Sequence, residues 1–329
     1  MKKIGNRTLL IVFCILAAIA VIIYFYDKNK GEKTFRTDLF TVDSAKVTAI
    51  TIYPKGKPDG SIKLAKNGKN WEVLSNRKTY PADTATIQRL ISALLNVKAE
   101  RVAGNDKFSW KELEISDSAS TRVVVEQNKE VAADFRLGKI SFPRDNTANP
   151  NGRNQNLIVK SHIRVAGDEK VYVVDGFLSM MFGDRSSAYR NKMVYRFDKK
   201  MVEKLTFTYP GDSSFSLEKN GTRWLLNRQP ADSAKVETYL NNTANTTSIE
   251  FAEENITAPV LYPFLLKMEG NNMPSILASG ATGGTPEMYF VKSTVNPAEV
   301  FGSSNPGLFN RIFPGKGKFE TEKGRKQKK

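Results

Sequence analysis

Two acidic residues in matching surroundings could act together as a general acid and a general base. Asp83 lies in the stretch "YPADTAT", and Asp232 lies in "QPADSAK". Two carboxyl groups can catalyse hydrolysis if folding brings them together in different protonation states. Each residue also precedes a stretch with helical spacing, where its side chain can cap the first turn by accepting backbone N–H bonds. We therefore predict two helix caps, with a carboxylate-based hydrolase as the weaker alternative.

Nucleophilic and metal chemistry require residues that this sequence scarcely contains. It has one cysteine, Cys14, inside an apolar run, and one histidine, His162. A catalytic triad or a zinc site needs several such residues placed together. The glycine-rich stretch 278–287 lacks the Lys-Ser/Thr pair of a phosphate-binding loop. We therefore predict a protein that is not an enzyme and that holds no metal and no cofactor.

Basic and aromatic residues gather in one short segment, which contains Arg185, Tyr189, Arg190 and Lys192. The chain carries a formal net charge of +16, which favours anionic partners such as lipid head groups or cell-wall polymers. The segment is therefore a candidate anion-binding site, and a solvated loop is the alternative. No nucleic-acid-binding motif accompanies the charge, so we expect no nucleic acid partner.

The N-terminal segment predicts a membrane anchor. Residues 8–26 carry no charge, follow three basic residues and end in two tyrosines. A helix of about 20 apolar residues can span the hydrocarbon core of a bilayer. We therefore predict that residues 1–26 form a cytoplasmic tail and an uncleaved signal anchor in the inner (cytoplasmic) membrane. Residues 27–45 would form a stalk, and the body would lie in the periplasm.

A six-residue phrase occurs twice, as "KNGKNW" at 66–71 and "KNGTRW" at 219–224. Asn-Gly between alternating apolar residues is the strongest short signal for a β-hairpin, and a type I′ turn needs positive φ at both central residues. The predicted turn residues are Asn67, Gly68, Asn220 and Gly221.

Two tryptophans follow these turns directly. With the predicted turns, Trp71 faces Leu64 and Trp224 faces Leu217 on the same side of each hairpin. Apolar cross-strand pairs on one face are typical of a core. We therefore predict that both tryptophans are buried, and lining of a ligand cleft is the alternative.

The similarity between the two halves extends beyond the hairpins. The matched stretches are 47–54 with 202–210, 80–96 with 229–245, and 171–175 with 288–292. Each half reads as a strand, a hairpin, a helix and further strands. The predicted fold class is α+β: an N-terminal transmembrane helix followed by two tandem related units, 46–200 and 201–315, each a mainly antiparallel sheet with a packed helix. Residues 316–329 are predicted to be a disordered basic tail.

Several of these stretches resemble the bacterial domain-of-unknown-function family numbered 4340. The matching stretches are "LAKNGKNWEV", "PAD", "RLGK" (136–139), "VYVVD" (171–175), "YRNKMVYRFD" (189–198) and "VNPAEVFG" (295–302). The family has no assigned activity. Its members are often encoded beside components of gliding-motility-type ABC transporters, which implies an accessory protein outside the cytoplasm.

The function predicted at this level is therefore an accessory or binding protein, anchored to the membrane through residues 8–26. The resemblance implies ABC-type export or gliding-motility transporter subunits as partners. A module that binds an anionic envelope polymer, and then a carboxylate-based hydrolase, are the alternatives.

Overall fold

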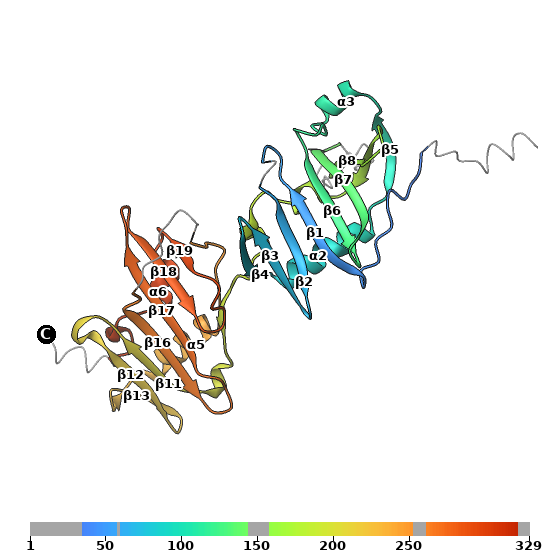
Figure 1. Cartoon of the computed structure of the whole chain (residues 1–329). Helices are drawn as coiled ribbons and strands as arrows, with labels where there is room; N and C mark the ends of the chain where they lie inside the picture. Colours follow the sequence, from blue (N-terminus) through green and yellow to red (C-terminus); the bar gives the residue numbers. More distant parts are fainter. Residues whose placement is uncertain (1–34, 58–59, 144–157, 253–260, 322–329) are drawn as a thin grey trace, which may run out of the picture. The chain divides into compact units, whose positions relative to one another are not determined.

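A computed structural model describes residues 35–57, 60–143, 158–252 and 261–321 (Figure 1). The chain forms two compact units. Unit 1 comprises Met1–Ser61 and Arg89–Asp184, and unit 2 comprises Ile62–Gln88 and Arg185–Lys329. This division groups the first predicted hairpin with the C-terminal part of the chain.

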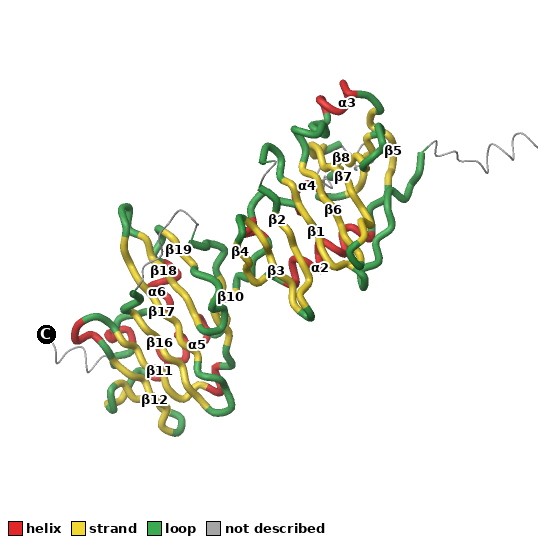
Figure 2. Tube along the Cα trace, in the orientation of Figure 1, coloured by secondary structure: helices red, strands yellow, loops and turns green. Residues whose placement is uncertain are grey.

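The predicted fold class is wrong, because the structure is mostly antiparallel sheet and its helices are short (Figure 2). None of the helices in the described part of the chain has the length and apolar character needed to cross a membrane. The predicted anchor at residues 8–26 lies outside the described residues. Apolar residues of the body mainly alternate with polar ones at the strand period of two, so their burial requires sheets.

The first sheet has nine strands in the order β4-β3-β2-β1-β6-β7-β8-β9-β5. Its strands are β1 (Val47–Tyr53), β2 (Ile62–Asn67), β3 (Asn70–Ser75), β4 (Lys78–Pro81), β5 (Ala99–Gly104), β6 (Thr121–Gln127), β7 (Glu130–Ser141), β8 (Lys160–Val165) and β9 (Val171–Asp175). The accompanying helices are α2 (Thr84–Leu95), α3 (Lys107–Glu112), α4 (Leu178–Met181) and the 3₁₀ helix η1 (Ser186–Ala188). The buried side chains of α2 recur at helical spacing at Ile87, Leu90, Ile91 and Leu94.

The second sheet has eight strands in the order β14-β13-β12-β11-β16-β17-β18-β19. Its strands are β11 (Val202–Thr208), β12 (Phe215–Asn220), β13 (Arg223–Leu226), β14 (Gln229–Pro230), β16 (Phe264–Gly270), β17 (Ile276–Gly283), β18 (Met288–Ser293) and β19 (Phe301–Ser303). A separate two-stranded sheet pairs β10 (Met193–Arg196) with β15 (Asn245–Thr247). The helices are α5 (Ser233–Thr243), α6 (Gly307–Ile312), η2 (Lys199–Met201), η3 (Gly211–Ser213) and η4 (Lys316–Lys318).

The strands follow one another in the same way in both sheets. The order β4-β3-β2-β1-β6-β7-β8-β9 corresponds place by place to β14-β13-β12-β11-β16-β17-β18-β19. By this order β18 corresponds to β8, and β9 corresponds to β19. The sequence match of 171–175 with 288–292 therefore joins strands that occupy different places in the two sheets.

The beginning of the predicted C-terminal tail is part of the folded body. Phe319 is fully buried, with its ring centre 5.4 Å from that of Tyr239 and 6.1 Å from that of Phe207. Its carbonyl accepts a hydrogen bond of 2.9 Å from the backbone N–H of Asp232. The prediction of disorder from residue 316 is therefore wrong for residues 316–321, because one aromatic ring outweighs the basic composition around it. Residues 322–329 lie outside the described residues.

The turn of the first hairpin lies one residue later than predicted. Its central residues are Gly68 and Lys69, and of these two only Gly68 has a positive φ, of 59°. Glycine in the first central position is the pattern of a type II′ turn, whereas the predicted type I′ turn needs two positive φ values. The second hairpin behaves alike, with Gly221 at φ 60°.

This shift changes the partners across each hairpin. Trp71 pairs with Lys66 instead of Leu64, and Trp224 pairs with Lys219 instead of Leu217. Each partner changes by two residues, so the same side chains stay on the same face. Both tryptophans are accordingly buried, with 8% and 1% of their surface exposed.

We expect Gly68→Val and Gly221→Val each to lower the free energy of unfolding by about 1–2 kcal/mol, because a side chain at positive φ clashes with its own backbone. Thermal denaturation measures the loss. Gly315→Val is the matched control, since Gly315 has a φ of −68° and open space around a new Cβ. Equal melting temperatures for all three variants would contradict the turn assignment.

Candidate anion-binding site

Arg190, one of the four predicted anion-binding residues, is committed to a buried ion pair within unit 2. Its Nε donates a hydrogen bond of 2.9 Å to Oε1 of Glu299, and its second terminal nitrogen donates to Oε2. Glu299 is fully buried, and Arg190 is 7% exposed. Burial raises the pKa of Glu299, and the hydrogen bond from Arg190 opposes that rise.

Two aromatic rings enclose the guanidinium of Arg190. Its Cζ lies 3.8 Å from the ring centre of Tyr80 and 4.1 Å from that of Phe251. A cation over an aromatic face is stabilised by the ring quadrupole, and the effect grows when water is excluded. The charge of Arg190 is therefore satisfied by a carboxylate at its edge and by rings near its centre.

The other three predicted residues do not complete a site around Arg190. Tyr189 is 1% exposed, and its carbonyl accepts a hydrogen bond from the N–H of Asp83. The carbonyl of Lys192 accepts one from Ser248. Arg185 is exposed. Tyr189 and Arg190 therefore hold the fold, and the predicted four-residue anion site is not assembled.

The stretches "YRNKMVYRFD" and "VNPAEVFG" contact each other, which sequence reasoning missed. Besides the ion pair, the side-chain N–H₂ of Asn296 donates to the carbonyls of Asn191 (3.1 Å) and Met193 (2.9 Å). Asn296 is 2% exposed. A buried amide that satisfies two backbone carbonyls fixes the position of the segment that precedes β10.

We expect Arg190→Met to lower the free energy of unfolding by about 3–5 kcal/mol, because it leaves the buried Glu299 carboxylate unpaired. Adding Glu299→Leu should recover most of that loss, because both charges are then absent. Urea denaturation measures both effects, with the exposed Arg185→Met as control. If the double variant is no more stable than Arg190→Met, the pair is not the cause.

The structure places the two acidic candidates at the N-termini of their own helices. Oδ1 of Asp83 accepts from the N–H groups of Ala85 (3.0 Å) and Thr86 (3.2 Å). Oδ1 of Asp232 accepts from the N–H of Lys235 (3.2 Å), and hydrogen bonding to Lys235 lowers the pKa of Asp232. Each carboxylate is therefore used by its own helix and points to no shared catalytic site.

A different set of charged residues does come together, in unit 1. Arg122 on β6 is the cross-strand partner of Arg136 on β7, which is the partner of Arg164 on β8. Directly opposed residues on antiparallel strands point to the same face, about 4.5–5.5 Å apart at Cβ. The three arginines, which we call the arginine row, therefore form a line across three strands. Like charges in this arrangement repel, so the row needs compensation.

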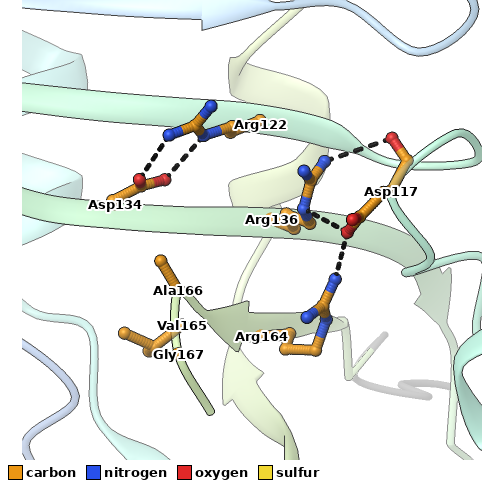
Figure 3. A pocket seen from close by; sticks show the side chains of 8 residues that line it. All are labelled: Asp117, Arg122, Asp134, Arg136, Arg164, Val165, Ala166 and Gly167. Carbon is orange, nitrogen blue, oxygen red and sulfur yellow. Dashed lines mark hydrogen bonds and ion pairs between the residues drawn. The ribbon is translucent and has the colours of Figure 1, made fainter. Parts of the chain in front are cut away.

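Two aspartates supply that compensation unequally (Figure 3). Asp134 forms a two-point pair with Arg122 alone, with distances of 2.9 Å to Nε and 2.6 Å to the second terminal nitrogen. Asp117, in the loop before β6, uses one oxygen for two arginines. Its Oδ1 lies 2.9 Å from Nε of Arg136 and 2.6 Å from a terminal nitrogen of Arg164.

Aromatic rings and burial complete the environment of the arginine row. The guanidinium of Arg164 lies 4.0 Å from the ring centre of Trp110, and that of Arg122 lies 5.5 Å from Tyr53. Burial, and then the charges of Arg164 and Arg122, lower the pKa of Arg136, whereas Asp117 opposes that change. Hydrogen bonding to Asp134 raises the pKa of Arg122. Every arginine remains cationic near neutral pH.

The row lines a pocket of about 280 Å³, whose wall also contains residues 165–167 at the end of β8. The side chains of Arg164 and Arg136 are 10% and 20% exposed, whereas that of Asp117 is 75% exposed. Partly buried guanidiniums with a planar fork of donors are suited to carboxylate or phosphate groups. No group of three His, Cys, Asp or Glu residues that could hold a metal is found among the residues that the structure describes.

Sequence reasoning missed the arginine row. Its members are separated by 14 and 28 positions, and each looks like an ordinary polar residue alternating within a strand. The available signal was an arginine inside three successive strands, at "TRVVV", "DFRLG" and "HIRVA". Only the strand register brings these residues into line.

His162 lies on β8 with Arg164 and is 3% exposed. One ring nitrogen, Nδ1, lies 2.8 Å from the carbonyl oxygen of Lys139. Burial, together with the charges of Lys139 and Arg101, lowers the pKa of His162, whereas the hydrogen bond to Lys139 opposes this. These surroundings give the ring a structural role.

We expect the unfolded state to bind a proton at His162 more readily than the folded state. Stability should therefore fall as the pH drops through the unfolded value of about 6.5 towards the lowered folded value. Urea denaturation at about pH 7 and pH 5.5 measures the loss, and NMR titration of the single histidine gives the folded pKa. The loss should be smaller in His162→Gln, and an unshifted pKa would contradict this account.

The fold and the site together define a protein of antiparallel sheets with an arginine-lined pocket in the first sheet. The chain belongs to the family described as Domain of unknown function (DUF4340), whose model matches residues 71–264, more than half of the chain. This match confirms the family resemblance, and the matched range contains the whole arginine row. Searches of curated proteins and of solved structures found no match.

Proposed function

We propose that this chain is a non-enzymatic binding protein that holds an anionic group of its ligand in the pocket of the arginine row. The observation that carries the proposal is that Arg136 and Arg164 share a single oxygen of Asp117. Two guanidiniums supply ten N–H donors, and one carboxylate oxygen satisfies few of them. Arg136 also donates to the carbonyl of Asp117 (3.2 Å) and the hydroxyl of Ser120 (3.4 Å), and Arg164 donates to the carbonyl of Ile115 (3.4 Å). These contacts leave several N–H groups, and the charge of the pair, for an anion from solution.

The local charge balance supports the same conclusion. Three guanidiniums face two carboxylates in this pocket, so one positive charge is uncompensated. Arg122 and Asp134 form a complete two-point pair, so the excess is centred on Arg136 and Arg164. The sequence-based alternative of an anion-binding module is thus retained, with its site moved from residues 185–192 to the arginine row.

A carboxylate-based hydrolase has less support. A general acid must hold a proton that it can transfer, and its base must be free to accept one. The carboxylates of Asp117 and Asp134 both accept hydrogen bonds from guanidiniums, so neither is free to serve as a base. Asp83 and Asp232 are used as helix caps. We therefore infer binding without catalysis.

We propose the partner from the family resemblance. That resemblance implies an accessory role beside an ABC-type export or gliding-motility complex, outside the cytoplasm. Two sheets with the same strand order are also consistent with duplication of one ancestral unit, as the repeated sequence stretches predicted. Neither hypothesis is needed for the arginine row to bind an anion.

We expect Arg136→Gln and Arg164→Gln each to weaken the binding of simple anions about tenfold or more. A hydrogen bond to a charged group contributes about 1.5–3 kcal/mol, and 1.4 kcal/mol corresponds to a factor of ten. Isothermal titration calorimetry of the full chain with phosphate, sulfate and citrate measures the affinities.

The matched control is Arg101→Gln, which removes the same charge from an exposed position on β5 outside the pocket. If all three variants bind these anions equally, only the net charge matters and the site assignment is wrong. If the wild type and Asp117→Asn both bind none of the anions, the proposed function is wrong.

A further inference from the structure

The loop that carries Asp117 lies between two buried residues, Ile115 and Ser120. Ile115 is fully buried, and its N–H donates to the carbonyl of Trp110 (2.8 Å). Ser120 is 4% exposed, and its hydroxyl donates to the carbonyl of Ser116 (2.6 Å). Between them Asp117 is held by Arg136 and Arg164 while its side chain stays 75% exposed. The backbone N–H of Ala119 also donates to the carbonyl of Ser116 (3.2 Å), so Asp117 lies in a short surface turn. We expect this turn to move away from the arginines as one piece.

We propose that Asp117 is an internal competitor, which occupies the place of the ligand's anionic group and is displaced when a dianionic phosphoryl group binds to Arg136 and Arg164. This inference rests on the proposed function. The Asp117 carboxylate sits between the two guanidiniums, where an anionic ligand would be bound. A ligand must therefore make better contacts than this carboxylate already makes.

Charge and geometry decide which anions can do so. A ligand carboxylate offers the same charge as Asp117 but lacks the advantage of being tethered to the protein, where the effective concentration is high. A phosphate monoester carries about −1.5 to −2 charges at neutral pH and has three acceptor oxygens. It can neutralise both guanidiniums and give each its own oxygen atoms. The site should therefore select a phosphoryl group over a monocarboxylate.

The neighbouring ion pair limits the site to two arginines. Asp134 lies within the strand β7 and contacts Arg122 at two points. Unlike Asp117, it is not on a loop, so we expect it to stay in place when a ligand binds. Arg136 also donates to the carbonyl of Asp117 (3.2 Å), a contact that is lost when the loop moves. The phosphoryl group must replace this contact as well, which the second and third oxygens allow.

Calorimetry on the full chain tests the competition. We expect Asp117→Asn to bind inorganic phosphate at least tenfold more tightly than the wild type, and the wild type to bind phosphate at least tenfold more tightly than acetate. Asp134→Asn removes the same charge but frees Arg122, so its gain should be smaller. Glu114→Gln, which removes an exposed carboxylate paired with Lys55, should change nothing.

The source of the phosphoryl group is a separate arm of the experiment. Neutral vesicles with and without phosphatidic acid, whose head group is a phosphate monoester, are compared with free phosphate and glycerol 3-phosphate. If only the vesicles with phosphatidic acid bind, and Asp117→Asn strengthens that binding, the ligand is a lipid head group. If only the free compounds bind, and Asp117→Asn strengthens that binding, the ligand is soluble. In either case the dependence on Asp117 supports the inference.

Hydrogen exchange on the wild-type protein tests the displacement of Asp117 without any substitution that could disturb the fold. Saturating phosphate should increase amide exchange at residues 116–119 while the strands β6 and β7 stay protected. Increased protection of that loop would overturn displacement.

The two proposals fail in different ways. Equal or weaker phosphate binding by Asp117→Asn, with the wild type still binding in an Arg136-dependent manner, overturns the competitor and leaves the proposed function standing. Binding by Asp117→Asn alone supports both proposals, because the wild-type site would then be closed by its own carboxylate. Absence of binding in both proteins overturns both.

Discussion

The arrangement of unit 2 depends on one buried charge pair, Arg190 with Glu299. Removing two charges from water is costly, and the attraction between them offsets that cost only when the geometry is good and further contacts satisfy the groups. Here the carboxylate of Glu299 accepts two hydrogen bonds from the guanidinium of Arg190. The rings of Tyr80 and Phe251 enclose that guanidinium. Four segments far apart in the sequence must therefore be in place together.

The same residue type serves the opposite purpose in unit 1. Arg190 has a carboxylate of its own and is sealed from solvent, whereas Arg136 and Arg164 share one carboxylate oxygen beside an open pocket. The side chains are chemically identical. They differ in whether the carboxylate is shared and in whether solvent can reach the guanidinium. An arginine that is sealed from solvent with its own carboxylate holds a fold, and one that shares a carboxylate beside an open pocket can hold a ligand.

The second sheet shows that the fold does not require the arginine row. The strands β16, β17 and β18 correspond to β6, β7 and β8, and the residues in the places of the three arginines are Leu265, Ser279 and Lys292. One cation replaces three, so no repulsion needs compensation there. The aligned arginines are thus a property of the first sheet. Opposed like charges destabilise a sheet, so the row depends on its pairing with Asp117 and Asp134.

The sequence by itself determined the local structure and the family. Asn-Gly predicted both hairpins to within one residue, and the helical spacing of Ile87, Leu90 and Leu94 predicted α2, because these signals act over a few residues. Strand register and burial depend on partners many positions away. Only the tertiary structure therefore shows that Arg190 is buried in an ion pair, and only the pairing of β6, β7 and β8 brings three scattered arginines into one row.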